Sequence, residues 1–597
     1  MNIIEKKSVK ITGGFWKRKQ ELNRKVTINA VWDRFSDTGR IGAFKFDWKE
    51  GMENKPHYFW DSDVAKWMEG AAYLIAQEYD AELDKKIEML VDLIEKNQCE
   101  DGYFNIYFTV CEPDARFTKR WCHELYCAGH LIEAAVAYYE ACGKRKFLDL
   151  MIKYVDLIYR VFVTEGSAKF KTPGHEEIEI ALIKLYKVTG DKKHLDLARF
   201  FLDNRGIEKE QEPLVSIDQS HMPVREQRTA EGHAVRACYL YTAMADMAKE
   251  IGDNELFEAC KAIYGDIVNH KMYITGGIGS THVGETFTIP FDLPNVSAYN
   301  ETCASISMMF FSKSMLALEN NSLYADIIER EMYNGMLSGL SLDGKAFFYE
   351  NPLEINLKNY VRHVSTTTGD RYPIKQRVEV FGCSCCPPNL NRLLPLIGDY
   401  IYGYEDRTVY VNQFIESEMS FGNMSVKQTT EYPNNGVVKL EFDGVDTAMI
   451  RLPSWCTEFD IDCVYELENG YIKIASPRNI TVNFKMRVRF VKSSSDVWEN
   501  SGRTAVCYGP IVYCAESIDN VENLHSLIVN NNPDAKIEYN EEIGLNTLEI
   551  NGYRELPNDS LYNEDEDILE STRLRLIPYS CFANRGDASM LVWLRRQ

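Results

Sequence analysis

The feature that most constrains the fold of this chain is a boundary between two helices that recurs through residues 15–403. Apolar residues there follow a period near 3.6, which predicts a succession of amphipathic helices. One predicted helix ends at a small or polar residue, a few polar residues follow, and another helix begins, as at residues 141–144, 188–191 and 250–254. Glycine at such a boundary supplies a left-handed C-cap, and the polar residue after it caps the next helix. The chain is therefore predicted to fold into helical hairpins.

These segments predict about twelve helices. Their predicted bounds are 18–34, 61–79, 82–97, 120–142, 145–160, 175–189, 192–203, 229–250, 253–270, 301–319, 322–338 and 388–402. Ten of them form five hairpins, and the last pairs with the first to close a ring. Six helical hairpins in a ring make an (α/α)6 barrel, whose loops at one end enclose a deep pocket. A helical solenoid is the alternative, but long irregular loops favour a barrel with an elaborated mouth. These loops are residues 98–119, 204–228, 271–300 and 340–387.

After Tyr404 the apolar period becomes that of a strand. Apolar and polar residues alternate in four short segments, at residues 408–411, 437–442, 471–474 and 481–484. Asn435-Gly436 and Asn469-Gly470 lie between such runs and predict hairpin turns. A β-sandwich is predicted here. A further β-rich stretch from about residue 497, with Asn551-Gly552 as another turn, predicts a second sandwich.

The fold class is therefore a helical barrel followed by β-sandwich domains, and it divides the chain into four parts. Residues 1–12 are an N-terminal segment that we expect to add a strand to the β region. Residues 13–404 form the (α/α)6 barrel, which we expect to be the catalytic domain. Residues 405–496 form one sandwich, and residues 497–597 form the second.

The charge of the chain excludes two classes of partner. The formal net charge is −22, which repels nucleic acid phosphates and anionic membrane surfaces. No run of eighteen apolar residues is present, so no membrane span is predicted. The first twenty residues carry charges but lack the apolar core of a secretory signal. We therefore expect a cytoplasmic protein that acts on a small molecule.

The sixteen cysteines are mostly scattered through apolar patterns, as expected of small buried residues in a reducing compartment. The exception is the run 382–387, Gly-Cys-Ser-Cys-Cys-Pro, which lies just before a predicted helix. Thiolates are stabilised at a helix N-terminus. Cys385 and Cys386 are adjacent and can ligate one metal ion, and Glu301 and Cys303 could complete a zinc site. A closed site with four cysteine ligands is the alternative, but the chain has no pair of CxxC motifs.

Other polar residues are candidates for a pocket at the barrel mouth. The loop 276–285 is rich in glycine but lacks the Lys-Ser/Thr of a phosphate loop, so nucleotide binding is rejected. Glu285 ends this loop and is either a pocket carboxylate or a solvated charge. His123, His175 and His233 begin helices in successive hairpins, so we expect them to gather at one mouth. Each of them could instead be a buried core or capping residue.

At these residues the chain resembles glycoside hydrolase family 127, the β-L-arabinofuranosidase type, along nearly its whole length. The paired cysteines, with Glu-Thr-Cys upstream, are the most specific part of the resemblance. The motifs that carry it lie at residues 61–67, 123–126, 221–225, 232–236, 276–285, 301–305, 382–387, 452–455 and 583–586.

The resemblance implies an (α/α)6 catalytic barrel with β-sandwich domains and an exo-acting hydrolase that releases L-arabinofuranose. It implies that Cys385 is the nucleophile and that Glu285 is the acid/base. The zinc ligands that it implies are Glu301, Cys303, Cys385 and Cys386. The residues that it implies for the sugar pocket are His123, His175, His233, Glu329 and Tyr349. No role is assigned to Cys383, and the stretch 363–376 is longer than expected and would alter the pocket mouth.

The mechanism expected from this resemblance is retention of configuration by double displacement. Retaining glycosidases normally use two carboxylates, one as nucleophile and one as acid/base. Here a zinc-bound thiolate would replace the nucleophilic carboxylate, because a free cysteine with a pKa of roughly 8.5 is mostly protonated at neutral pH. The acid role of Glu285 calls for a raised pKa, which a partly buried pocket can supply.

Three rival functions stay open at this point. A member of the same family could act on a different furanoside or a branched acidic sugar. A sugar epimerase on the same barrel would use paired histidines and no metal. A sugar-binding protein without catalysis is the third, although the full set of candidate residues argues against it. The expected partner is a small oligosaccharide or glycoside; the second β region is compatible with a homodimer contact, but nothing in its pattern requires one.

Overall fold

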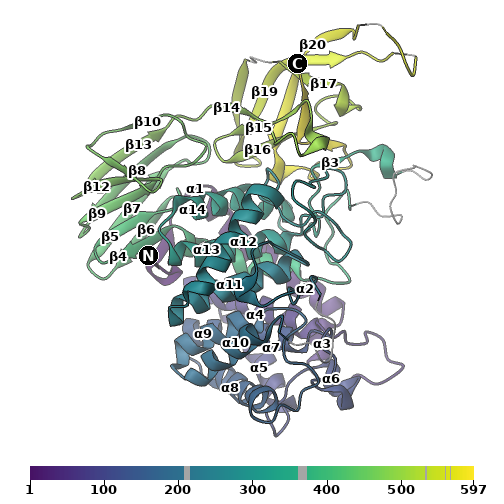
Figure 1. Ribbon diagram of the computed structural model, residues 1–597, viewed down its shortest axis with the longest axis vertical. Helices are drawn as coiled ribbons and strands as arrows, with labels where there is room; N and C mark the ends of the chain where they lie inside the picture. Colours follow the sequence, from purple (N-terminus) through teal and green to yellow (C-terminus); the bar gives the residue numbers. More distant parts are fainter. Residues whose placement is uncertain (208–214, 361–372, 531–533, 559, 565) are drawn as a thin grey trace.

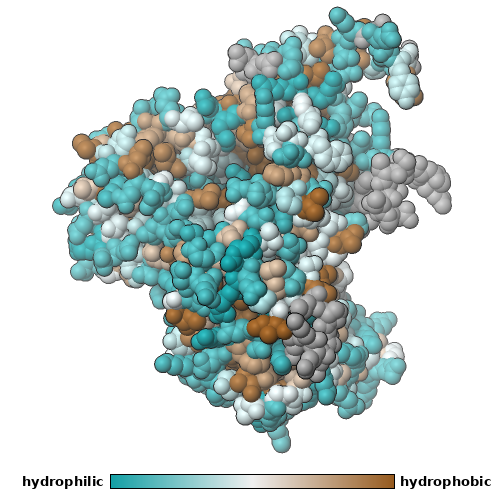
Figure 2. Space-filling model, in the orientation of Figure 1, coloured by the Kyte–Doolittle hydropathy of each residue, from teal (hydrophilic) through white to brown (hydrophobic). Residues whose placement is uncertain are grey.

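The structure is a computed structural model that describes every residue except 208–214, 361–372, 531–533, 559 and 565. A helical domain is followed by two β regions, one beside the barrel and one that carries the C-terminus (Figure 1). This is the predicted fold class, and it is confirmed. The face shown in Figure 2 is mostly hydrophilic, with apolar residues in small groups. Within the described residues, every helix is too short or too polar to cross a lipid bilayer.

Six helices form an inner ring. They are α4 (Trp60–Gln77), α7 (Glu124–Cys142), α9 (Ile178–Thr189), α11 (Ala234–Ile251), α13 (Thr302–Leu318) and α15 (Cys386–Leu393). Each packs against the next, and α15 packs against α4, so the ring is closed. These helices are buried on nearly all sides, as expected for helices that are covered by a second layer.

Six further helices form the outer layer. They are α2 (Ile28–Asp37), α5 (Ala81–Asn97), α8 (Lys146–Tyr159), α10 (Lys192–Asn204), α12 (Asn254–Asp266) and α14 (Ser322–Arg330). Five of them pack against the inner helix that precedes them in the chain, and α2 packs against α4 and α15. The two layers therefore make the (α/α)6 barrel. Short helices α1 (Gly14–Leu22), α3 (Arg40–Ala43) and α6 (Tyr107–Val110) lie outside this count.

The predicted boundaries between helices have the expected caps. Gly143, Gly190 and Gly252 end inner helices in the left-handed conformation, with φ of 70°, 71° and 71°. The side chains of Asp191 and Asp253 then accept backbone N–H groups at the start of the next outer helix. Glycine has no Cβ to clash in this conformation, so the chain reverses at little cost.

The predicted starts of three inner helices are a few residues too early. The prediction began them at residues 120, 175 and 229, whereas α7, α9 and α11 begin at Glu124, Ile178 and Ala234. His123 is one reason, because its φ of 56° lies outside the helical region and ends the loop before α7. The histidines therefore stand at the rim of the barrel, ahead of the helices.

The first β region is a sandwich of two six-stranded sheets. One sheet runs β1 (Asn2–Ile3), β4 (Tyr402–Glu405), β5 (Thr408–Val411), β9 (Thr447–Arg451), β12 (Tyr471–Ala475) and β11 (Glu466–Glu468). The other runs β10 (Phe459–Ile461), β13 (Asn479–Phe484), β8 (Val437–Asp443), β7 (Met424–Thr430), β6 (Ser417–Phe421) and β2 (Val9–Ile11). The N-terminal strands β1 and β2 pair with β4 and β6, so the start of the chain adds a strand to each sheet.

The C-terminal strands and β3, from the loop before α15, form one ten-stranded sheet. Its strands are β14 (Val488–Val491), β15 (Arg503–Tyr508), β22 (Trp593–Arg596), β17 (Leu527–Val529), β19 (Leu545–Glu555), β20 (Leu569–Pro578), β16 (Ile511–Glu516), β21 (Met590–Leu591), β3 (Glu354–Ile355) and β18 (Ala535–Asn540). Because β15 also pairs with β16, the path from β15 through β22, β17, β19 and β20 to β16 closes on itself.

Two details of the β region differ from the prediction. Strand β14 pairs with β15, so the boundary between the two β regions lies before Val488 and not at residue 496. Asn551-Gly552 is not a turn but lies inside β19, where Gly552 pairs with Thr572. A Cβ at Gly552 would lie 2.4 Å from the carbonyl oxygen of Ile528, so glycine is needed there for close approach of a neighbouring strand.

A buried ion cluster joins the sandwich to the barrel. Arg451 of β9 is fully buried and pairs with Asp326 and, at 2.6 Å, with Glu329, both on α14. Its Nε donates to the carbonyl oxygen of Asn412 at 2.6 Å. The charge has left water completely, so the contact depends on all of these partners.

We predict that Arg451→Met destabilises this junction by about 3–5 kcal/mol, because two carboxylates lose their buried counter-ion. The first transition in differential scanning calorimetry should move to lower temperature. The matched control is Arg407→Met, which removes an exposed pair with Asp446 and should cost about 1 kcal/mol or less. Equal shifts for the two variants would contradict a structural role for the cluster.

Candidate active site

A pocket opens at the mouth of the barrel, where the N-termini of inner helices converge. The N-cap residues of α7, α11, α13 and α15 are His123, His233, Glu301 and Cys385, and all four line it. Helix N-termini carry partial positive charge, so the site favours anionic groups. The full lining is Phe59, Ser62, Asp63, His123, Tyr126, His175, His233, Val235, Arg236, Glu285, Glu301, Cys303, Tyr349, Cys383 and Cys385.

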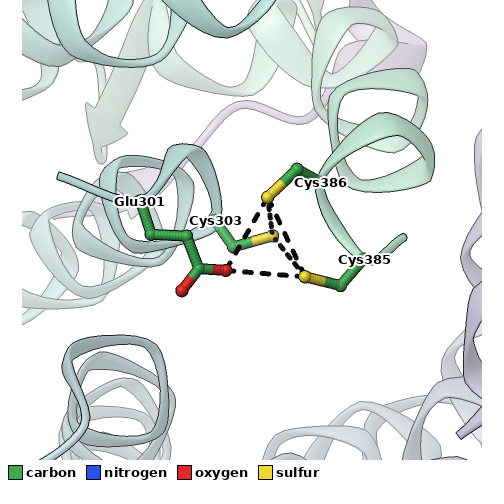
Figure 3. A group of neighbouring side chains, drawn as sticks. All are labelled: Glu301, Cys303, Cys385 and Cys386. Atoms are coloured by element: carbon green, nitrogen blue, oxygen red, sulfur yellow. Dashed lines mark hydrogen bonds between the residues drawn. The ribbon is translucent and has the colours of Figure 1, made fainter. Parts of the chain in front are cut away.

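Three of the four residues proposed as metal ligands, Glu301, Cys303 and Cys385, line one wall of the pocket, and the fourth, Cys386, is fully buried beside them. Their side chains point toward one common point from the starts of α13 and α15 (Figure 3). The Sγ atom of Cys303 lies 3.5 Å from that of Cys385 and 3.3 Å from that of Cys386. Oε1 of Glu301 lies 3.5 Å and 3.7 Å from the sulfurs of Cys385 and Cys386.

These distances fit a tetrahedral metal site. A metal–sulfur bond of about 2.3 Å puts the corners of a tetrahedron about 3.8 Å apart. Oε2 of Glu301 is buried without a hydrogen-bond partner among the described residues. Burial, and then the charges of Cys385 and Glu285, raise the pKa of Glu301 well above its usual range. Four such groups therefore need a cation to be ionised together, and the cluster could hold a metal ion.

A buried lysine adds positive charge beside this cluster. Lys66 on α4 is only 1% exposed, and its Nζ lies 2.6 Å from the hydroxyl of Tyr126, a pocket residue. Burial lowers the pKa of Lys66, but Cys385 and Cys303 raise it more, so the net shift is upward. Lys66 thus balances part of the charge of the thiolates. The sequence analysis did not identify Lys66 as a site residue, although it lies in a motif that carries the resemblance.

Glu285 lies next to the cysteine cluster in a hydrogen-bonded group. The hydroxyl of Tyr299 donates to its Oε1 at 2.6 Å, and Nε2 of His233 lies 2.6 Å from its Oε2. The backbone N–H of Val235 donates to Nδ1 of His233, so the proton of neutral His233 is on Nε2 and is donated to Glu285. One oxygen each of Glu285 and Glu301 and one nitrogen of His233 lie within 4.8 Å of one another. This joins the Glu285 group to the cysteine cluster.

The prediction of a raised pKa for Glu285 is wrong. Burial does raise the pKa of this carboxyl, but the hydrogen bonds from His233 and Tyr299 and the charge of Arg236 outweigh it. The net result is a pKa lowered to about 2, so the ligand-free pocket holds an ionised carboxylate. The prediction failed because it considered burial without the two donors that the fold brings to the carboxylate, one to each oxygen.

The three histidines do lie together. The ring centres of His123 and His175 are 5.4 Å apart, and those of His175 and His233 are 5.7 Å apart. Burial, and then the charge of Arg236, lower the pKa of His123 to about 3 and that of His175 well below its usual value. Neutral imidazoles can hydrogen-bond to sugar hydroxyls as donors or acceptors. Tyr349 also lines the pocket, and its hydroxyl lies 3.2 Å from Sγ of Cys385.

A second prediction needs correction: Glu329 was expected in the sugar pocket, but it lies outside this pocket. Its carboxylate is held by Arg451, by the hydroxyl of Tyr432 and by the indole N–H of Trp455 at the barrel–sandwich junction. These donors occupy both of its oxygens, so its role is structural. Of the stretch 363–376, residues 363–372 lie outside the described residues.

The sequence analysis assigned no role to three further residues, two in the pocket lining and one beside Glu285. Arg236 follows His233 by three positions on α11, which puts both on one helix face and could have identified it. Cys383 had no assigned role; it is exposed and lies 3.8 Å from the hydroxyl of Tyr349, in the lining of the pocket. Tyr299 had no signal, since only folding brings it to Glu285.

Known proteins share this fold and its domain order. The model of the β-L-arabinofuranosidase GH127 catalytic domain matches residues 8–399. The models of the GH127 middle and C-terminal domains match residues 408–486 and 488–595. A non-reducing end β-L-arabinofuranosidase of Bifidobacterium longum subsp. longum is 34% identical over 665 aligned residues, which cover 99% of this chain and 100% of that protein.

Solved structures of GH127 enzymes have the same fold as this chain. A GH127 β-L-arabinofuranosidase from Geobacillus stearothermophilus T6 has a TM-score of 0.92 at 38% identity, covering 99% of this chain and 100% of that one. Another GH127 β-arabinofuranosidase has a TM-score of 0.90 at 34% identity, covering 100% and 98%. Fold and relatives together define an enzyme that hydrolyses glycosides. The chain belongs to glycoside hydrolase family 127.

We predict that Cys386→Ser lowers metal content after gel filtration, because a hydroxyl is a poorer ligand than a thiolate for a soft site. Inductively coupled plasma mass spectrometry of the purified protein measures this, and we expect close to one equivalent in the wild type. The control is Cys383→Ser, whose thiol lies outside the cluster and should leave the metal content unchanged. Full retention in the Cys386 variant would contradict the ligand set.

Proposed function

We propose that this enzyme is a retaining, exo-acting β-L-arabinofuranosidase that releases L-arabinofuranose from the non-reducing end of β-L-arabinofuranosides. The observation that carries the proposal is the position of Cys385, whose sulfur faces the pocket between Glu301 and Tyr349. The names of the relatives in the family support the sugar and the linkage.

We further propose that the metal is zinc, held by Glu301, Cys303, Cys385 and Cys386. Three sulfur donors and one carboxylate suit zinc better than magnesium or calcium, which prefer oxygen ligands. When bound, zinc would keep the sulfur of Cys385 ionised at neutral pH, since a coordinating thiol is deprotonated. The positive charge of Lys66 supports the same ionised state.

In the first step the sulfur of Cys385 attacks the anomeric carbon. A carbon–sulfur bond forms, the glycosidic carbon–oxygen bond breaks, and the leaving oxygen takes a proton from Glu285. In the second step a water molecule gives a proton to Glu285 and attacks the same carbon, and the carbon–sulfur bond breaks. Two inversions at one carbon retain the configuration. His123, His175 and His233 would hold the sugar hydroxyls in place for both steps.

The lowered pKa of Glu285 fits the second step directly, because an ionised carboxylate is ready to accept a proton. For the first step, Glu285 must take up a proton together with the substrate. We expect the leaving oxygen to displace Tyr299 or His233 from the carboxylate. Losing one of these donors removes a cause of the lowered pKa, and burial then raises it.

We predict that Cys385→Ser lowers the hydrolysis of 4-nitrophenyl β-L-arabinofuranoside by roughly 10⁴-fold or more, because the nucleophile is lost. Release of 4-nitrophenol measures the rate, and thermal unfolding verifies that the variant is folded. Cys463→Ser, a half-buried thiol in the sandwich, is the matched control and should keep full activity. Near-normal activity of the Cys385 variant would refute the proposed nucleophile.

A second prediction concerns Glu285→Ala. With 4-nitrophenol, a leaving group that needs little protonation, the first step should survive and the second should stall, since no base activates water. Added azide needs no base and should restore turnover, with a β-L-arabinofuranosyl azide of retained configuration as the product. Absence of rescue, or an inverted azide, would rule out the double displacement with Glu285 as its base.

A further inference from the structure

We infer that Arg236 and Trp121 form a second sugar site at the rim of the pocket, which binds the leaving group of the substrate. This inference rests on the proposed function, since it assigns the part of the glycoside beyond the arabinose. The ligand that this site would bind has an apolar face and two adjacent oxygen atoms that accept hydrogen bonds.

Arg236 is a half-buried arginine that differs from three fully buried arginines of the barrel. Its side chain lines the pocket, and its Nε and Nη1 are enclosed without an acceptor among the described residues. In contrast, Arg40, Arg205 and Arg392 each have a carboxylate partner, at 2.9, 2.8 and 2.8 Å. Enclosed N–H groups of a guanidinium that lack an acceptor are unfavourable. Because the side chain borders the pocket, the acceptor is expected from the molecule that fills it.

The charge of Arg236 acts on the catalytic side of the pocket. Its positive charge contributes to lowering the pKa values of Glu285, His123, His175 and His233. Glu285 is the carboxylate among these four residues, and its oxygens are already held by His233 and Tyr299. The pocket itself therefore does not supply the acceptors that Arg236 lacks.

Trp121 provides the apolar surface beside this charge. The guanidinium carbon of Arg236 lies 5.7 Å from the centre of its ring, and the residue is 38% exposed. The carbonyl oxygen of Trp121 lies 3.1 Å from Nδ1 of His123, a pocket residue, which places the backbone of Trp121 next to the pocket rim. Gly174 packs against this segment so closely that a Cβ would lie 2.6 Å from the carbonyl oxygen of Arg120. The backbone that carries the indole is thus held in place before a ligand arrives.

The position favours the leaving group over the arabinose. Cys385 and Tyr349 mark the end of the pocket where the anomeric carbon must lie, and Glu285 marks where the leaving oxygen must lie. The charge of Arg236 lowers the pKa of Glu285, and Trp121 is more exposed than the pocket residues His175 and His233. A sugar ring in the leaving group could pack its C–H face on the indole. Two adjacent oxygens, either neighbouring hydroxyls or a carboxylate, would accept from the guanidinium.

The experiment compares kcat/KM for 4-nitrophenyl β-L-arabinofuranoside and for two disaccharides, in which arabinofuranose is attached to a neutral sugar or to a uronic acid. Arg236→Met and Trp121→Ala should lower kcat/KM for disaccharides by roughly tenfold more than for the aryl glycoside. A changed pKa of Glu285 would also slow the disaccharides more than the aryl glycoside, because 4-nitrophenol needs little protonation. Trp121→Ala leaves the charge of Arg236 in place, so the ratio for this variant isolates the leaving group. A larger loss with the uronic acid identifies a carboxylate as the acceptor pair, and equal losses identify hydroxyls.

Matched controls are Arg228→Met, an exposed arginine bonded to backbone carbonyls, and Trp498→Ala, an exposed tryptophan beyond the barrel. Neither should change the ratio. Trp121 is at the surface, so its variant is expected to fold even if the Arg236 variant does not. An active enzyme whose ratio changes less than about twofold in both variants would overturn this site alone. A wild type that cleaves none of the three substrates would overturn the proposed function, and the site with it.

Discussion

The active site depends on the closure of the helical ring. Glu301 and Cys303 start α13, while Cys385 and Cys386 start α15, and more than eighty residues separate the two pairs. They meet because α15 packs between α13 and α4, and residues at the N-termini of all three helices line the same pocket. A shift of α15 along its neighbours would separate the sulfurs that now lie 3.3–3.8 Å apart. The outer helices and the sandwich contact help to fix this register.

Charge balance is the second constraint on the site. The cysteine cluster gathers anionic groups in a buried place, and Lys66 and the N-termini of the inner helices offset part of that charge. On the other side, Arg236 and the donors to Glu285 stabilise a carboxylate, while burial keeps the histidines neutral. The pocket therefore combines an anionic wall, which suits a thiolate nucleophile, with neutral groups that can bind sugar hydroxyls.

The sequence predicted those features that depend on local chemistry. Gly143 and Gly190 mark hairpins because a left-handed cap needs glycine, and the helix count and ring closure follow from such boundaries. The site was predicted through the family resemblance, since spacing alone does not bring Cys303 to Cys385. Features that depend on distant neighbours were missed. The pKa of Glu285 depends on Tyr299, and Glu329 turns to Arg451 because the sandwich covers α14.

The central claim is that the sulfur of Cys385 forms a covalent bond with the sugar. Mass spectrometry of the Glu285→Ala variant, quenched after mixing with 4-nitrophenyl β-L-arabinofuranoside, tests this directly. The account predicts a mass increase of one pentosyl unit, mapped to the peptide that contains Cys385. An adduct on another residue, or turnover without any adduct, would contradict it.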